Sequence, residues 1–483
     1  MRRTTELAEQ GSSRAVELPP QMSYASLGGS NTLGACDTTG KQRCNHTSFA
    51  RLTFDALTSL GVVKWANGGI GAMGPQLAAA CTNKFAPAGT RYATIEYLPN
   101  LGYTNDDHGE MAAIEKLLHV LQSRGARVAF VNILPGKAMP RFANCHEREV
   151  GCTTHKHIER LHTAIGKLAA SYSVPMITMD HDGQSGIGLF GEDKMHLNQA
   201  GHAHVHAELM RLYSGWPHWQ LGLNSTVHND DASRAARLMN VACHMGDELA
   251  PLIGGARGFT RINFARDPNG RADKIGWEAR TAGAALTLCT GFPTEPPVQP
   301  KGAREDRPLL SNGGASEYRY VIAVGMQLSH VLNLPLFGVA HVACAGACQC
   351  SCKWSHHGAF NESCLYDGLT KGGATVTAFV RMLARRTENA TGGGGASGDN
   401  GSGRSAGEGR AGRSAARACG HGMCAVTITN SPDVAEPRLR VVVRSLMVGY
   451  NQHHSSKWLN TYHLDGTGLT DYRRRRRLMS VSR

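Results

Sequence analysis

The first 215 residues alternate short apolar runs with longer amphipathic segments. Each run ends at polar or turn-forming residues, as buried strands do, and the segments between the runs carry apolar residues at helical spacing. Alternating strands and helices predict an α/β fold, in which a parallel sheet lies between two layers of helices. The predicted strands cover 22–27, 61–66, 93–98, 127–134 and 174–179.

The clearest predicted helix spans 107–124, where apolar residues recur every three or four positions and Gly125 can end the helix. Two more helices are predicted around 49–57 and 158–168. Ligands of open parallel sheets bind beyond the carboxyl ends of the strands. Polar residues that directly follow a predicted strand are therefore the first candidates for chemistry.

The pattern changes after Trp216, where β-rich segments follow one another with turn residues between them. Several short strands without intervening helices predict a mainly antiparallel β-sandwich or jelly-roll-like domain. These segments lie at 317–324, 338–344, 373–380, 424–429 and 438–449.

A chain of 483 residues is long for a single hydrophobic core, so two domains are expected. In the stretch 392–418, Gly, Ser, Ala and Arg leave almost no large apolar side chain for a core, and this insert is expected to be disordered. The predicted division is a polar N-terminal segment (1–20), an α/β domain (21–215), a linker (216–240), a cysteine-rich β domain that contains the insert (241–470) and a basic tail (471–483).

Composition and charge narrow the expected partners. Apolar residues make up 41% of the chain, yet no stretch reaches the roughly 18 consecutive apolar residues of a membrane helix, so no membrane span is expected. The formal charge of +13 includes the arginine run at 473–477 and arginines of the insert. The excess charge thus lies partly in tail and insert, and no specific nucleic-acid partner is expected. The oligomeric state stays open.

The cysteines bear on the compartment. Fourteen cysteines, eight of them between Cys289 and Cys424, are many for a cytosolic enzyme and suit a compartment in which disulfides form. Residues 1–20, however, lack the apolar centre of a signal peptide. The location therefore stays open, with a secretory or extracellular one suggested by the cysteines and by glycosylation sequons. The sequons are at Asn45, Asn224, Asn361, Asn389 and Asn400.

A cysteine cluster raises the question of a metal. The candidate zinc ligands differ in spacing from the paired C-x-x-C of structural zinc sites; they are Cys344, Cys348, Cys350 and Cys352, with His341, His356 and His357 nearby. Disulfides or buried thiols are the preferred interpretation. Neither a metal nor a cofactor is expected.

Acyl transfer needs a nucleophile, a base, a group that orients the base and donors for the oxyanion. Ser30 follows the first predicted strand, where Gly28 and Gly29 let the backbone turn sharply. Asp193 and His196 precede the last predicted helix of the first domain. Their three-residue spacing lets the carboxylate hold one imidazole nitrogen while the other faces Ser30.

Candidate oxyanion donors follow the next two predicted strands. The glycine-rich turn at 67–74 exposes backbone amides. Asn100 ends the third predicted strand, and Asn105 is the alternate side-chain amide. Alone, the Gly-Gly-Ser motif is more simply explained as a loop and the glycine-rich motif as a turn. An Asp-x-x-His pair alone is commonly a surface pair or a metal-ligand candidate. The conjunction of the four motifs favours a hydrolase site.

In order and spacing, the four motifs resemble the conserved blocks of the SGNH (GDSL-like) hydrolases, and the resemblance covers residues 22 to about 215. It implies a flavodoxin-like three-layer α/β/α sandwich with Ser30 as nucleophile, His196 as general base and then acid, and Asp193 as its orienter. It also implies an oxyanion hole formed by the Ser30 amide, a second-block amide and the Asn100 side chain.

Three positions depart from the family pattern. The Asp that usually precedes the nucleophile is Gly29 here, which alters the loop more than the chemistry. The usual glycine of the second block aligns with Ala72, with Gly71 one residue earlier, and a backbone N–H can donate from either. The third block has one residue too many before Asn105, so Asn100 is favoured because it ends the strand directly.

The cysteine-rich β domain, with its motifs at 276–277, 282–284 and 344–352, resembles an extended form of these hydrolases seen in green algae and plants. The resemblance implies a serine esterase that cleaves a small acyl ester through an acyl-enzyme. Its expected substrate is a small acyl ester or an acylated polysaccharide, with O-acetyl groups on carbohydrate as one candidate. The alternatives are an O-acyltransferase with the same triad and a catalytically inactive carbohydrate-binding or surface protein.

Overall fold

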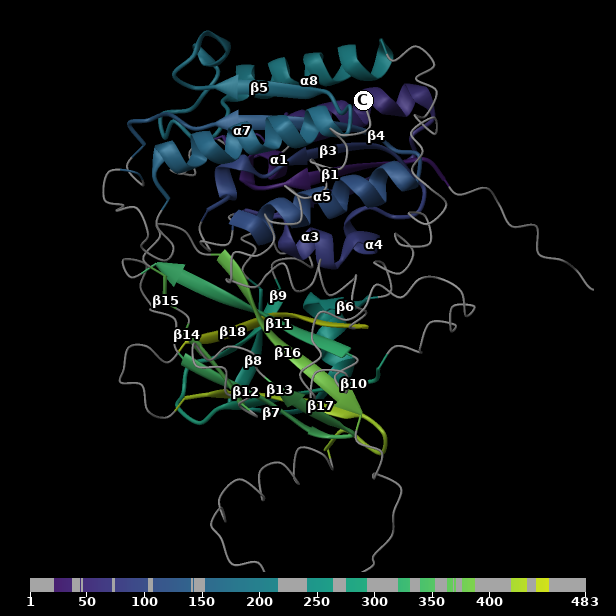
Figure 1. Cartoon of the computed structure of the whole chain (residues 1–483), viewed down its shortest axis with the longest axis vertical. Coiled ribbons are helices and arrows are strands. Elements are labelled where there is room, and N and C mark those ends of the chain that lie inside the picture. Colours follow the sequence, from purple (N-terminus) through teal and green to yellow (C-terminus); the bar gives the residue numbers. More distant parts are fainter. Residues whose placement is uncertain are drawn as a thin grey trace, which may run out of the picture.

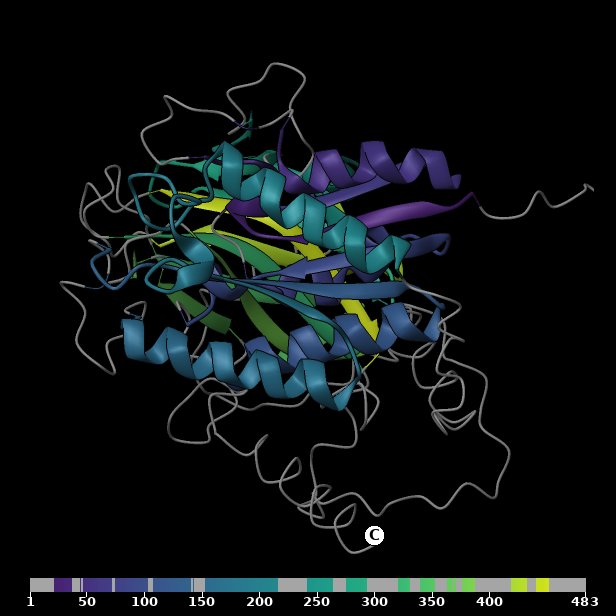
Figure 2. The same ribbon diagram turned by 90° about the horizontal axis from the view of Figure 1, so that it is seen from above.

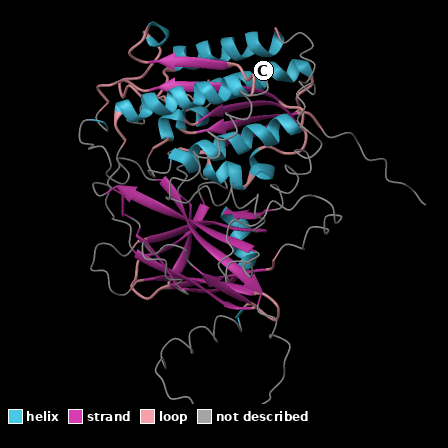
Figure 3. Ribbon diagram, viewed as in Figure 1, coloured by secondary structure: helices cyan, strands magenta, loops and turns pink. Residues whose placement is uncertain are grey.

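The computed structural model of the chain has two folded parts, one rich in helices and one built of strands (Figures 1 and 3). The predicted N-terminal segment, linker and basic tail, nearly all of the insert and the asparagines of the five sequons lie outside the described residues. The predicted domain boundaries therefore stay a prediction. The structure describes residues 21–36, 44, 47–71, 74–102, 107–139, 142, 153–215, 241–263, 275–292, 320–330, 339–351, 363–367, 369–370, 376–386, 418–431 and 440–450.

A five-stranded parallel sheet forms the centre of the first part. Its strand order is β2-β1-β3-β4-β5, the flavodoxin-like order, in which the direction of strand addition reverses at β1. All five strands end at the same edge because they run parallel. The strands are β1 (Ser23–Gly28), β2 (Lys64–Gly69), β3 (Thr90–Glu96), β4 (Arg127–Leu134) and β5 (Met176–Asp180).

Helices cover both faces of the sheet, which Figure 2 shows lying between two helical layers. Alternation along β1 places Tyr24 in the core beneath one layer and Leu27 in the core beneath the other. The predicted three-layer fold is thus confirmed. Among the described residues, no helix has the length and apolar character that crossing a bilayer requires. One layer holds α2 (Phe49–Leu57) and α8 (Gln199–Ser214); the other holds α3 (Gln76–Ala80), α4 (Thr82–Phe85), α5 (Asp107–Ser123) and α7 (His155–Ser171).

The second strand lies three residues later than the predicted span of 61–66. Asn67 and the two glycines after it, which the sequence places in a turn, pair in register with the last three residues of β1. A Cβ on Gly68 would lie 2.9 Å from the Leu27 side chain and 3.1 Å from that of Phe85. Glycine is thus needed here for close packing rather than for a turn, and the glycine-rich turn begins only at Ile70.

The second part is a β-sandwich, so the predicted antiparallel sandwich is confirmed. One sheet has the order β14-β12-β17-β10-β7, and the other has the order β13-β16-β11-β18-β9-β8, with β6 added to β18 and β15 to β11. All pairings are antiparallel except that of β11 with β15. Inward side chains of the two sheets, such as Val426 and Val448, meet in one core. The strands are β6 (Val241–Met245), β7 (Ile253–Arg257), β8 (Phe259–Asn263), β9 (Ile275–Ala279), β10 (Ala285–Thr290), β11 (Tyr320–His330), β12 (Val339–Gly346), β13 (Cys348–Ser351), β14 (Ser363–Asp367), β15 (Leu369–Thr370), β16 (Val376–Arg386), β17 (Cys424–Asn430) and β18 (Val441–Tyr450).

The two parts are joined by apolar packing and by a covalent bond. Met245, Ala323 and Met447 point away from the sandwich core and belong to the hydrophobic core of the α/β part. A disulfide links Cys81, which separates α3 from α4, to Cys243 on β6. Lys84 of α4 also forms an ion pair with Glu248. The sandwich therefore packs against the helical layer that contains α3 and α4.

Disulfides also account for the cysteine cluster of the sandwich. Cys344 pairs with Cys350 and Cys348 pairs with Cys424, which confirms the disulfide interpretation for these residues. The four sulfurs lie close enough to surround an ion. Paired sulfurs do not offer the thiolates that zinc binds, so the cluster is a structural cross-link of the two sheets.

Candidate active site

The nucleophile candidate sits at the carboxyl end of β1, beside the point where the strand order reverses. Ser30 begins α1 (Ser30–Leu33), a single turn that ends at Gly34 in the left-handed conformation (φ 99°). A Cβ on Gly29 would lie 1.6 Å from Nδ2 of Asn100, so no side chain fits at position 29 in this arrangement. The two glycines thus let the backbone pass close to the third strand end and present the half-buried Ser30 at the edge of the sheet.

Asp193 and His196 lie in the loop between β5 and α8. Oδ1 of Asp193 accepts hydrogen bonds from the backbone N–H groups of Met195 and His196, at 3.0 and 2.9 Å. Lys194 takes a positive φ of 58°, which closes this tight loop. Oδ2 of Asp193 is left to face the imidazole.

The structure brings the three predicted catalytic residues into one hydrogen-bonded chain. Ser30 Oγ lies 2.6 Å from His196 Nε2, and His196 Nδ1 lies 2.6 Å from Asp193 Oδ2. Because a carboxylate only accepts, Nδ1 carries the ring proton and Nε2 is free to accept the serine proton. This is the geometry of a Ser-His-Asp triad, with His196 only 4% exposed.

The electrostatics keep Asp193 ionised. Burial raises the pKa of its carboxyl, but hydrogen bonds from the His196 ring and from the backbone N–H groups of His196 and Met195, with the attraction of a charged imidazole, bring the pKa down to about 2. An ionised carboxylate stabilises the imidazolium that forms when His196 takes a proton.

Of the predicted oxyanion donors, the structure places Asn100 beside the nucleophile turn. Asn100 ends the 3₁₀ turn Leu98–Asn100 after β3, is 4% exposed, and its Nδ2 has no hydrogen-bond partner among the described residues. A buried amide N–H without an acceptor costs free energy. It is therefore a donor ready for a ligand atom. Asn105, the alternate, lies outside the described residues.

The second block also approaches the nucleophile turn. Ile70 N–H donates to the Gly28 carbonyl at 2.9 Å, and a Cβ on Gly69 would lie 2.7 Å from Leu33 N in α1. Gly71 follows directly, while Ala72 lies outside the described residues. The choice between their two amides stays a prediction.

Asn31 is a part of the site that the sequence analysis missed. It is fully buried, and its side chain bridges the nucleophile turn to the histidine loop. Oδ1 accepts from Leu197 N–H at 2.9 Å, and Nδ2 donates to the Met195 carbonyl at 3.4 Å. Asn31 thus holds the backbone on both sides of His196. An Asn in a small polar run carries no signal for such a contact.

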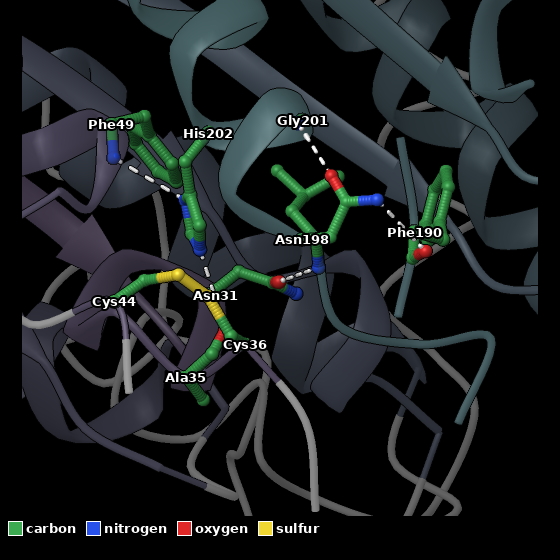
Figure 4. The surroundings of a disulfide bond; sticks show 10 residues. Asn31, Ala35, Cys36, Cys44, Phe49, Phe190, Asn198, Gly201 and His202 are labelled. Atoms are coloured by element: carbon green, nitrogen blue, oxygen red, sulfur yellow. Dashed lines mark hydrogen bonds between the residues drawn. A yellow bond between two sulfur atoms is a disulfide. The ribbon is translucent and has the colours of Figure 1, made fainter. Parts of the chain in front are cut away.

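His202 and a disulfide contact the segment that follows α1 (Figure 4). His202 Nδ1 accepts from Phe49 N–H at 3.3 Å, so Nε2 carries the proton and faces the Ala35 carbonyl, also at 3.3 Å. Burial lowers the pKa of His202 to about 4, so the ring stays neutral. The Cys36–Cys44 disulfide lies next to it. These contacts fix the segment that leaves α1 against α2 and α8.

Comparison with known proteins gave matches among solved structures only; no family model and no curated protein matches the chain. A two-domain esterase active on acetylated mannans is 16% identical and covers 89% of this chain and 91% of its own, with a TM-score of 0.48. Two other structures resemble a smaller part of the chain. A carbohydrate acetylesterase family member from Sinorhizobium meliloti is 17% identical and covers 42% of this chain and 100% of its own, with a TM-score of 0.30. A GDSL-like lipase from Bacteroides thetaiotaomicron is 15% identical and covers 40% of this chain and 87% of its own, with a TM-score of 0.29. Proteins with sequence identities this low can share a fold and differ in activity. The function is therefore derived from this chain's own residues.

Proposed function

We propose that this chain is a serine esterase that hydrolyses carboxylic esters through an acyl-enzyme. The observation that carries the proposal is the hydrogen-bonded chain from Ser30 through His196 to Asp193 at the carboxyl edge of the sheet. The unpartnered amide of Asn100 beside that chain supports it, because acyl transfer needs a donor for the oxyanion.

The reaction follows from the positions of the protons. Ser30 Oγ attacks the ester carbonyl while its proton passes to His196 Nε2, and the oxyanion that forms accepts hydrogen bonds from the Ser30 N–H and Asn100 Nδ2. The C–O bond to the alcohol then breaks, and His196 returns the proton to the leaving oxygen. A water molecule attacks the acyl-enzyme in the same way, which releases the acid and restores Ser30. Asp193 stays ionised throughout.

We also propose O-acetyl groups on carbohydrate as the substrate class. The resemblance of the four motifs to the SGNH hydrolases suggests small acyl esters as substrates. One of the proteins with a similar solved structure is an esterase active on acetylated mannans. Five disulfides among the described cysteines suit an oxidising compartment, so we propose a secretory or extracellular location.

Covalent labelling of the nucleophile tests the proposed function. Purified protein is incubated with a fluorophosphonate and, in parallel, with p-nitrophenyl acetate, p-nitrophenyl octanoate and acetylated mannan. We expect one phosphonate per chain, mapped by peptide mass spectrometry to Ser30, and release of acetate that the phosphonate abolishes. Hydrolysis of acetyl but not octanoyl esters would support the substrate class.

The other outcomes separate the alternatives. Transfer of acetyl to an added sugar in preference to water would identify an O-acyltransferase. A protein that is neither labelled nor hydrolytic but binds mannan would identify the inactive carbohydrate-binding protein and sink the esterase proposal.

Replacing Asn100 by Ala tests the oxyanion donor. Because the amide is made available without a ground-state partner, its loss affects the transition state more than substrate binding, and kcat should fall by about 10²- to 10³-fold with little change in KM. Asn83→Ala, at an exposed position on α4, is the matched control. Equal kcat values for the two variants would exclude Asn100 from the oxyanion hole.

A further inference from the structure

A buried carboxylate lies beneath the nucleophile turn and is not used in the acyl transfer steps. Glu96 is the last residue of β3, in register with Gly28 of β1, and its side chain is fully buried. Its Oε2 accepts hydrogen bonds from Gly29 N–H at 3.1 Å, from Thr32 N–H at 3.3 Å and from the Thr32 hydroxyl at 3.0 Å. One oxygen atom therefore holds the residues on both sides of Ser30 and Asn31.

We propose that Glu96 is a positioning residue, whose Oε2 holds the turn that carries Ser30 so that the hydroxyl faces His196 and the Ser30 N–H faces the acyl oxygen. This inference rests on the proposed esterase function. It deepens that function by assigning the placement of the nucleophile to a side chain on the neighbouring strand.

Glu96 holds the turn together with the Asn31 side chain and with the hydrogen bond from Ile70 N–H to the Gly28 carbonyl, and it is the side chain that reaches the Gly29 N–H. Position 29, directly before the nucleophile, cannot carry a side chain because Asn100 Nδ2 occupies the place of its Cβ. The Gly29 N–H lies within hydrogen-bond distance of both the Glu96 backbone carbonyl, at 3.0 Å, and the Glu96 side chain. The end of β3 thus supplies the acceptor that fixes the turn, and the 3₁₀ turn that follows β3 supplies the oxyanion candidate, Asn100.

The surroundings of Glu96 differ from those of a carboxylate kept for stability. Glu278, which is also buried, forms ion pairs with Arg280 and Arg440. No described residue forms an ion pair with Glu96, and its Oε1 has no partner among the described residues. Burial raises the pKa of Glu96 to about 7, against the lowering by the hydrogen bonds from Thr32 and Gly29. A buried acid without a counter-ion destabilises the fold, which favours a role in function.

The acceptor does not depend on the charge of the acid. Oε2 accepts its three hydrogen bonds whether the carboxyl is ionised or carries its proton on Oε1. Glutamine supplies an oxygen at the same place and should therefore serve, whereas leucine has a similar size and no acceptor. This contrast separates the loss of positioning from the loss of a charge or of packing.

The test compares four variants, Glu96→Leu, Glu96→Gln, Thr32→Val and Thr90→Val, for hydrolysis of p-nitrophenyl acetate and for the rate of fluorophosphonate labelling, each per folded molecule. Glu96→Leu should lower kcat and the labelling rate by about 30-fold with KM within about threefold, because a displaced nucleophile slows the attack and leaves binding intact. Glu96→Gln should recover most of this loss. Thr32→Val removes one of the three hydrogen bonds and should lower kcat by about three- to tenfold.

Thr90→Val is the matched control, because Thr90 is also fully buried and hydrogen-bonded but begins β3, at the opposite end of the strand. It should lower the melting temperature without changing kcat. If Glu96→Leu does not fold, the comparison of Thr32→Val with Thr90→Val decides. Equal kcat and labelling rates in Thr32→Val and Thr90→Val, or a Glu96→Gln protein as slow as Glu96→Leu, would overturn the positioning role. A wild-type protein that neither hydrolyses esters nor is labelled would instead overturn the proposed esterase.

Discussion

Replacing Ser30 by Ala lowers kcat for p-nitrophenyl acetate by about 10⁴- to 10⁶-fold if Ser30 is the nucleophile, because no acyl-enzyme can form. The substitution removes one oxygen from a half-buried side chain, whose hydroxyl lies 2.6 Å from His196 Nε2. The melting temperature should therefore change little. Stopped-flow and steady-state hydrolysis measure the loss, and the burst of p-nitrophenol should disappear with it.

Ser59→Ala provides the matched control for this loss. Ser59 is exposed on the 3₁₀ turn Thr58–Leu60, and its hydroxyl donates to the Ala56 carbonyl, at 2.7 Å. The control should keep the wild-type kcat and remain reactive toward the phosphonate. A Ser30→Ala protein as fast as Ser59→Ala would exclude Ser30 as the nucleophile.

Local sequence patterns were sufficient to predict the α/β part and to select the three residues that the structure joins in one hydrogen-bonded chain. Strand ends marked by glycine and polar residues identified Ser30 and Asn100, and the three-residue spacing identified Asp193 with His196. A parallel sheet brings its strand ends to one edge, so residues 166 positions apart, such as Ser30 and His196, could be expected to meet. Distances and protonation could not be predicted, because they depend on side-chain placement.

The residues that hold the site in place were not predicted, for a physical reason. Glu96 and Asn31 act on the backbone of distant segments, and their type and spacing do not differ from those of ordinary polar residues at a strand end or in a turn. Only the register of β3 on β1 shows that Glu96 lies under Gly29 and Thr32. Such contacts depend on tertiary structure rather than on a motif.

The β-sandwich shows the same limit in its strands. The five predicted segments correspond to β11, β12, β16, β17 and β18, which are the longer and more apolar strands. The strand β7 (Ile253–Arg257) contains two glycines, which are depleted in strands, and β8 (Phe259–Asn263) is only five residues long. They form because β7 pairs with β10 and β8 pairs with β9. No local sequence pattern predicts these pairings.

Replacing Asp193 by Asn is expected to lower kcat by about 10⁴-fold by reversing the tautomer of His196. Oδ1 of residue 193 accepts from two backbone N–H groups, those of Met195 and His196, so the amide oxygen of the substituted side chain must stay there. The amide NH₂ then replaces Oδ2 and faces His196 Nδ1, which has to become the acceptor. The ring proton moves to Nε2, which can then no longer accept the proton of the Ser30 hydroxyl.

The tautomer can be observed apart from the rate. In protein labelled with ¹⁵N at histidine, the wild-type His196 ring should show its proton on Nδ1 and Asp193→Asn should show it on Nε2, while the kinetics give the matching loss of kcat. Asp55→Asn, which disrupts only the exposed ion pair with Arg51, should change neither. A lost rate with the proton still on Nδ1 would mean that Asp193 acts by stabilising the imidazolium alone. Because the Asp193→Asn protein keeps an acceptor for both backbone hydrogen bonds, the loop geometry is preserved, and the two measurements separate the orientation of the base from its charge.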